Sequence, residues 1–195
     1  MFSLQDLVGQ QQGNEALGQI SQMLGADQTT TNSAIQMALP MILSGLAKNA
    51  AQPSGAESLN NALQGNHDGG ILNDLGGYLN APDTNDGIGI LGHIFGQKQG
   101  AAAQQVSQNT GLDVGQVAQL MITLAPIVMA YLGRQKQQGN LDSGGLSNLL
   151  NEKQQQIQTS DNPMMGSISD MLDSDNDGSM MDDLASLASN YFKNR

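Results

Sequence analysis

The chain has 195 residues, with 18 acidic residues against 7 basic ones, a net charge of −11 and no cysteine. This acidity excludes a nucleic-acid-binding surface, because few side chains are present to neutralise a run of phosphates, and it favours cations and basic partners. The absence of cysteine excludes disulfides and thiolate chemistry, and aromatic residues at 3% leave Leu, Ile, Met and Ala to form the core.

The expected elements are helices throughout. Valine is scarce, alternating apolar and polar runs are absent, and Ala, Leu, Gln and Met dominate between breaks rich in Gly, Asn and Asp. This pattern predicts an all-α fold, a multihelical array with short polar loops. The N-terminus lacks the basic start and apolar run of a secretion signal, so the expected location is the cytoplasm.

Residues 1–153 are predicted to contain two similar helical units, residues 1–98 and a shorter unit, 99–153, packed on the first. The tripeptide at 20–22, Ile-Ser-Gln, returns 86 positions later as Val-Ser-Gln. The same offset relates Gly25 to Gly111, Asp27 to Asp113, Pro40 to Pro126, Ile42 to Val128 and Leu46 to Leu132. Since the spacing between these positions is kept, we predict a repeated supersecondary unit.

Each unit is expected to contain a helix, a Gly-x-Asp break and then an almost wholly apolar helix. Asp113 and Gln116 have the spacing of a capping box, and Asp27 stands at the equivalent place in the first unit. The apolar segments 34–47 and 117–132 are predicted to lie centrally in the core. Proline at position 40 or 126 is expected to kink or split the segment that contains it.

These two apolar segments could instead form a membrane hairpin. The longer one, 117–132, has sixteen residues and includes Gln119 and Thr123. A spanning helix needs about 20 predominantly apolar residues, so a buried core is the favoured interpretation and membrane spanning is not expected. Association with a membrane surface remains an alternative.

Patterns that suggest catalysis are few. Residues 87–92 match G-x-G-x-x-G, but a loop sequence precedes them where a dinucleotide fold has a strand, so nucleotide binding is not expected. His67 lies in a Gly- and Asn-rich turn and is expected to be a polar loop residue, while His93 is expected on a helix surface. Because the chain has no H-E-x-x-H, G-x-S-x-G or P-loop motif and no cysteine nucleophile, we predict that it is not an enzyme.

Residues 154–163 contain a single isoleucine and a run of glutamines, and they are predicted to form a flexible linker. Residues 164–195 are predicted to form an EF-hand-like helix–loop–helix around an aspartate-rich loop. Alternating aspartates direct carboxylates to one point, and Gly178 allows the sharp turn around an ion. The expected calcium ligands are Asp173, Asp175, Asp177, the carbonyl group of Ser179, and Asp182 or Asp183.

This loop departs from the standard pattern at its end. Its twelfth position is Leu184, and the closing acid comes one residue early. We therefore predict weak Ca²⁺ binding, with Kd on the order of 10⁻⁴ M. The alternative needs no metal: Ser179 and Asp182 have the spacing of a capping box, and acidic residues in a first turn suit the helix dipole.

The order of these features resembles a bacterial family, the YidB-like family or domain of unknown function 937. The motifs that carry the resemblance, in chain order, are Gly25-x-Asp27, Ala38-Leu39-Pro40, Asp68-Gly69-Gly70, residues 89–96, Leu124-Ala125-Pro126 and residues 173–184. The resemblance covers nearly the whole chain. It implies a multihelical bacterial protein without an established activity, and it provides no catalytic residues.

Together these patterns predict an interaction or structural module that carries a weak calcium site. Its expected partner is another protein or a second copy of the chain, and neither nucleic acid nor a spanned membrane is expected. One alternative is a scaffold or assembly protein whose aspartates only cap a helix. The other is a helical protein associated with a membrane surface.

Overall fold

The computed structural model describes residues 3–158, which belong to one compact unit and contain helices but no strand. The predicted all-α fold is thereby confirmed. In chain order its elements are α1 (Leu4–Val8), α2 (Gln10–Leu24), α3 (Gln28–Ala50), α4 (Pro53–Gly65), the 3₁₀ turn η1 (Gly70–Asn73), α5 (Leu75–Asn80), α6 (Thr84–Phe95), the 3₁₀ turn η2 (Gly96–Lys98), α7 (Gln99–Thr110), α8 (Val114–Gly139) and α9 (Ser143–Gln158).

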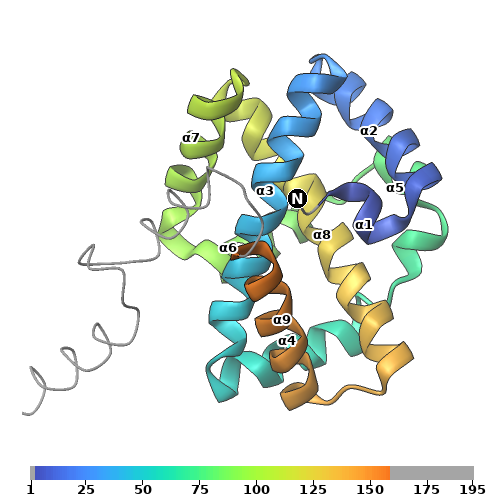
Figure 1. Ribbon diagram of the computed structural model, residues 1–195, viewed down its shortest axis with the longest axis vertical. Helices are drawn as coiled ribbons and strands as arrows, with labels where there is room; N and C mark the ends of the chain where they lie inside the picture. Colours follow the sequence, from blue (N-terminus) through green and yellow to red (C-terminus); the bar gives the residue numbers. More distant parts are fainter. Residues whose placement is uncertain (1–2, 159–195) are drawn as a thin grey trace, which may run out of the picture. The chain divides into compact units, whose positions relative to one another are not determined.

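Helices α3 and α8 form the centre of this unit (Figure 1). In segment 34–47 every residue except Gln36 is buried, and in 117–132 the exceptions are Ala118, Gln119 and Ile122. Both predicted core segments are confirmed. Helices that are apolar on all sides are stable in water only when others cover them, and here the remaining helices do so.

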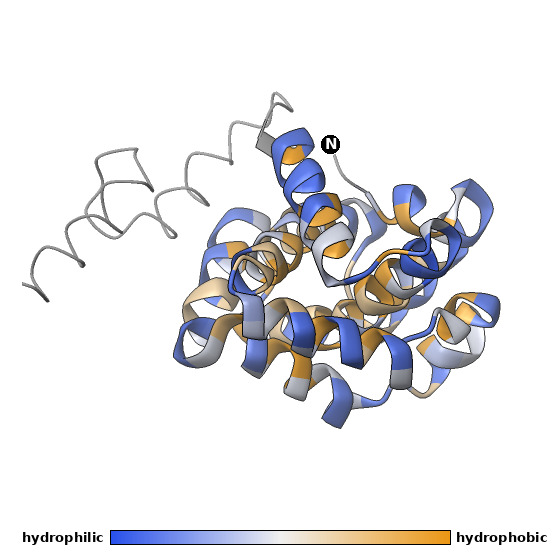
Figure 2. Ribbon diagram, turned by 90° about the horizontal axis from the view of Figure 1, so that it is seen from below, coloured by the Kyte–Doolittle hydropathy of each residue, from blue (hydrophilic) through white to orange (hydrophobic). Residues whose placement is uncertain are grey.

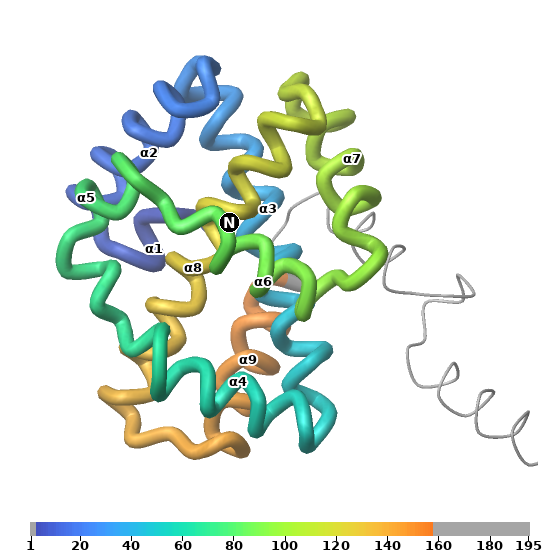
Figure 3. The backbone as a smooth tube through the Cα atoms, turned by 180° about the vertical axis from the view of Figure 1, so that it is seen from behind, coloured from blue at the N-terminus to red at the C-terminus, as the bar shows by residue number. Residues whose placement is uncertain are grey.

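The other helices are arranged around this pair. Helix α6 packs on α8 and α3, as the tube view from behind shows (Figure 3), and α7 also contacts both. Helices α2 and α5 pack together beside α8, while α4 and α9 cover the C-terminal part of α3. Apolar positions face inward and polar ones outward on most of these helices (Figure 2). The core is thus built from aliphatic residues.

The Gly-x-Asp breaks have the same local structure in both predicted units. Gly25 and Gly111 end α2 and α7 in the left-handed conformation, with φ of 65° and 81°. Asp27 caps α3, and Asp113 forms the predicted capping box with Gln116, both of its bonds being 2.9 Å long. The agreement concerns the breaks and the long helices that follow them. Duplication of the whole units, with a boundary at residue 98, stays a prediction.

Neither long helix is split at its proline, since α3 and α8 continue through Pro40 and Pro126. Pro126 lacks an amide hydrogen and leaves the carbonyl group of Ile122 without its helical donor. Gly87 of α6 lies directly against this carbonyl group, and a methyl group on Gly87 would overlap its oxygen. Glycine therefore permits the close approach of α6 to α8.

Helix α9 corrects the predicted linker, because residues 154–158 belong to this helix. The reason is an apolar stripe on α9, Leu146, Leu150 and Ile157, which is buried where α9 packs on α3 and α4. The hydroxyl group of Ser147 also donates to the carbonyl oxygen of Ala50 at 3.0 Å. Residues 159–163 and the predicted helix–loop–helix at 164–195 lie outside the described residues.

Within residues 3–158, α8 is the one helix long and apolar enough to cross a membrane. Length and composition alone qualify it, and the core helix of a water-soluble protein passes the same test. In this structure 67% of its most apolar window is buried. Its apolar surface is therefore largely used by packing against neighbouring helices.

Candidate functional site

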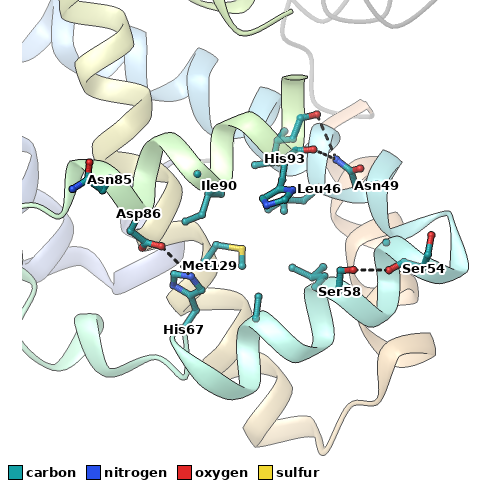
Figure 4. A pocket seen from close by; sticks show the side chains of 15 residues that line it. Leu46, Asn49, Ser54, Ser58, His67, Asn85, Asp86, Ile90, His93 and Met129 are labelled. Carbon is teal, nitrogen blue, oxygen red and sulfur yellow. Dashed lines mark hydrogen bonds and ion pairs between the residues drawn. The ribbon is translucent and has the colours of Figure 1, made fainter. Parts of the chain in front are cut away.

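A groove with a volume of about 530 Å³ opens between α3, α4 and α6, with α8 at its base (Figure 4). Its lining combines an apolar floor with polar groups towards its ends. The apolar side chains are those of Leu46, Leu59, Ala62, Ile90, Ile94 and Met129, and the polar ones are those of Asn49, Ser54, Ser58, His67, Asn85, Asp86 and His93. Gly55 and Gly89 complete the lining.

Helix α6 contributes most of one wall. Asp83 caps it by accepting from the amides of Asn85 and Asp86, at 3.0 and 3.2 Å. From this start, Asp86, Gly89 and His93 follow at spacings of three and four residues and share one helix face. The cap therefore determines which side chains of α6 enter the groove.

The junction of α3 with the end of α6 closes the far end of the groove. A side chain on Gly45 would overlap the Ile94 side chain, so glycine lets the two helices meet. The amide nitrogen Nδ2 of Asn49 donates to the carbonyl oxygens of His93 and Ile94, at 2.9 and 3.4 Å. The side chain of Asn49 thus satisfies carbonyl groups that the end of α6 leaves without helical donors.

At the other end, His67 belongs to a turn that α8 holds in place. A methyl group on Gly133 would overlap the carbonyl oxygen of His67, so only glycine allows this contact. Gln137 donates to the carbonyl oxygen of Asp68 at 2.8 Å. Gly69 adopts a φ of 102°, a conformation that residues with a side chain rarely adopt. The backbone of this turn is thereby fixed on α8.

His67 is therefore a buried residue, with 6% of its surface exposed, where a polar loop residue was expected. Its Nε2 atom lies 3.4 Å from Oδ1 of Asp86, and its Nδ1 atom has no hydrogen-bond partner within residues 3–158. Nε2 is thus the ring nitrogen that can donate to this carboxylate. The turn was recognised in the sequence, but the burial of His67 was not. His93, by contrast, is exposed, as predicted.

The phenol group of Tyr78 lies near enough to Asp86 and Asp83 for their charges to affect its pKa. The hydroxyl group of Tyr78 donates to the carbonyl oxygen of Thr123 at 3.2 Å. Burial, and then the charges of Asp86 and Asp83, raise the pKa of Tyr78 well above its usual range. Tyr78 thus stays neutral at physiological pH. Asp86 is then the one lining residue that carries a formal charge when the two histidines are neutral.

Two serines of α4, Ser54 and Ser58, line the groove. The hydroxyl group of Ser58 donates to the carbonyl oxygen of Ser54 at 2.8 Å. Within the described residues no hydroxyl group is hydrogen-bonded to a histidine, which an activated serine would require. The same part of the chain contains no group of three or more histidine, aspartate or glutamate residues that could hold a metal ion. Apolar surface with a few polar groups is typical of ligand sites.

The predicted calcium ligands, Asp173, Asp175, Asp177, Ser179, Asp182 and Asp183, all lie outside the described residues. The glycine motif at 87–92 lies inside α6, so it does not form a phosphate-binding turn between a strand and a helix. Two of its glycines have other roles: Gly87 contacts α8, and Gly89 lines the groove. The signal that could have found the groove is the recurrence of Asp86, Gly89-Ile90 and His93-Ile94 on one helix face, a pattern from which no site was predicted.

The described residues form an all-α fold with a groove between α3, α4 and α6. The chain belongs to a family described as bacterial protein of unknown function (DUF937), whose model matches residues 6–135. Searches of the curated proteins and of the solved structures found no match. The matched range includes every residue that lines the groove, whereas α9 follows it.

Proposed function

We propose that this protein is a non-catalytic interaction module, and that the groove between α3, α4 and α6 holds apolar side chains of a partner protein. The observation that carries this proposal is the apolar floor of the groove, which includes Leu59, Ile90 and Met129, with hydrogen-bonding groups at both ends of the groove. The volume of about 530 Å³ is within the range of small-molecule sites and accommodates the side chains of a short segment.

Apolar contact would supply most of the affinity. Full burial of one Leu- or Ile-sized side chain contributes about 1.5–3 kcal/mol, and two such side chains offset a part of the cost of association. The polar groups would set orientation, because a partner that left them unpaired would lose the free energy of their hydration. Specific but moderate binding is the expected outcome, as suits an interaction module.

The lack of an activated nucleophile supports a role without catalysis. His67 has Nε2 directed at Asp86, and its buried Nδ1 atom has no hydrogen-bond partner among the described residues. Neither ring nitrogen is placed to take a proton from Ser54 or Ser58. A membrane-surface role is less well supported, because α8 places most of its apolar surface inside the protein.

We further propose that the C-terminal loop binds Ca²⁺ weakly and adds a second, ion-dependent element to the module. Mutual repulsion of its closely spaced carboxylates favours a cation when the loop folds. Isothermal titration of the full chain beside an Asp173→Ala/Asp175→Ala double variant tests this site. We expect heat from the native chain alone at millimolar calcium. Equal heats, or none, would leave the aspartates as helix caps in a scaffold protein.

The groove is tested with a methyl label on methionine in the full chain. Met129 reports from the floor of the groove, while Met121 and Met41 are buried in the core and do not line it. Titration with 1-hexanol is expected to shift the Met129 methyl resonance in a saturable way and to leave the other two in place. A Met129 resonance that stays unmoved up to the solubility limit of the alcohol would contradict a binding groove.

A further inference from the structure

We infer that the groove selects a basic side chain of the partner, with its apolar stem on the floor and its cationic group at Asp86. The inference rests on the proposed function and specifies the chemistry of the same site. Among the described residues that line the groove, Asp86 alone is formally charged when the histidines are neutral, and none is a lysine or an arginine. An anionic group would therefore meet repulsion without any compensating cation.

The carboxylate of Asp86 also has unused hydrogen-bonding capacity. Its side chain is 31% exposed, and its described partner is Nε2 of His67 at 3.4 Å. This separation is beyond an ordinary N–H···O hydrogen bond, which is about 2.9 Å long. An ionised carboxylate accepts several such bonds, so a second donor can bind without displacing His67. A charged donor in a partly buried place forms a stronger bond than a neutral one.

The floor leads from this carboxylate along apolar side chains. Ile90 follows Asp86 by one turn of α6, and the Met129 side chain lies beside His67 and Asp86 in Figure 4. Lysine and arginine cover apolar surface with their methylene stems while the charged end finds a polar partner. This combination matches a groove with an apolar floor and one carboxylate at its end. The net charge of −11 also attracts basic partners over a longer range.

Three six-carbon probes separate apolar binding from charge selection: n-hexylammonium, 1-hexanol and hexanoate. Each is titrated against the full chain at low salt with the Met129 methyl resonance as readout. We expect the ammonium probe to bind about ten-fold tighter than the alcohol, and hexanoate more weakly than either. Raising the salt concentration is expected to reduce the advantage of the ammonium probe, because ions screen exposed charges.

The matched variants are Asp86→Asn and Asp83→Asn, which remove the same charge from the same turn of α6. Asparagine also caps helices, so Asp83→Asn keeps the start of α6, and Asp83 does not line the groove. Asp86→Asn is expected to abolish the difference between the ammonium probe and the alcohol, and Asp83→Asn to preserve it. Equal loss in both variants would mean a general charge effect and would overturn the inference.

The outcomes also distinguish the two proposals. If all three probes shift Met129 with equal affinity, the groove binds apolar chains, but selection by Asp86 is wrong. If hexanoate binds most tightly, the inferred partner chemistry is likewise wrong. If no probe shifts Met129, the proposed function fails and the inference fails with it.

Discussion

Two glycines in helices show how differently one residue type is used. Gly133 in α8 touches the carbonyl group of His67, whereas Gly92 in α6 has open space around it. Gly133→Ala forces the His67 turn away from α8, and overpacking of this kind costs about 1–3 kcal/mol. Gly92→Ala instead improves helix propensity by up to about 1 kcal/mol. Urea unfolding of both variants should give free energies of unfolding that change in opposite directions.

Equal changes in the two glycine variants would contradict the placement of His67 on α8. The comparison also controls for helix propensity, because both sites are inside helices and gain a methyl group. A loss of stability confined to Gly133→Ala identifies the contact as the cause.

Asp27 makes stability depend on pH at the start of α3. Its carboxylate accepts from the hydroxyl group and the amide of Thr30, at 2.7 and 2.9 Å, and these bonds lower its pKa below 3.8. Because the folded pKa is depressed, the stabilisation is complete above about pH 4 and is lost as the pH falls through the folded value. Asp27→Asn keeps a cap but does not titrate.

The unfolding free energy of Asp27→Asn should therefore fall less than that of the native chain between about pH 4 and pH 2. Above this range the native chain should be the more stable of the two, since its cap is charged and lies at the positive end of the helix dipole. If the free energies of unfolding of the native chain and of Asp27→Asn changed in parallel with pH, titration of Asp27 would not contribute to stability.

At the scale of elements, Gln116 connects the two Gly-x-Asp breaks. Its side chain accepts from the amide of Asp113 and donates to the carbonyl oxygen of Leu24 at 2.8 Å. Gln116→Ala removes both hydrogen bonds. From typical values for hydrogen bonds and helix caps, we expect the free energy of unfolding to fall by about 1–2 kcal/mol. Gln119→Ala is the control, since Gln119 is exposed one turn later in the same helix. An equal shift of the thermal unfolding midpoint in both variants would contradict the role of Gln116 in connecting the two breaks.

The elements that could be predicted are those determined by local pattern. Segments 34–47 and 117–132 are apolar enough that only a buried position suits them, and their Asp caps follow from side chains three residues apart. The end of α9 could not be predicted in this way. Glutamine-rich residues 154–156 favour no buried state by themselves, but Ile157 packs on the core and extends the helix past them.

For the whole molecule, the groove depends on contacts between segments that are distant in the chain. His67 was assigned correctly to a turn, but its burial results from Gly133 on α8 and its pairing from Asp86 on α6. No local pattern reports such contacts. The aspartates of the C-terminal loop are the opposite case, because their spacing is a local pattern that the sequence alone displays. The calcium site that they predict is tested by titration with calcium.

The groove between α3, α4 and α6 is the proposed binding site of the protein. Gly89 lines the groove, and a Cβ atom added there meets no neighbour within 4 Å, so a leucine is expected to extend into the groove. Gly92→Leu is the matched control, because Gly92 lies in the same helix but does not line the groove. Both changes should raise helix propensity and leave the fold intact.

The most direct measurement is the affinity of n-hexylammonium for the full chain, with the Met129 methyl resonance as readout, in the native protein and in these two variants. We predict that Gly89→Leu weakens binding at least ten-fold, while Gly92→Leu retains native affinity, with both proteins as stable as the native chain or more so. Unchanged affinity in a folded Gly89→Leu variant would contradict the claim that this groove is where the protein binds.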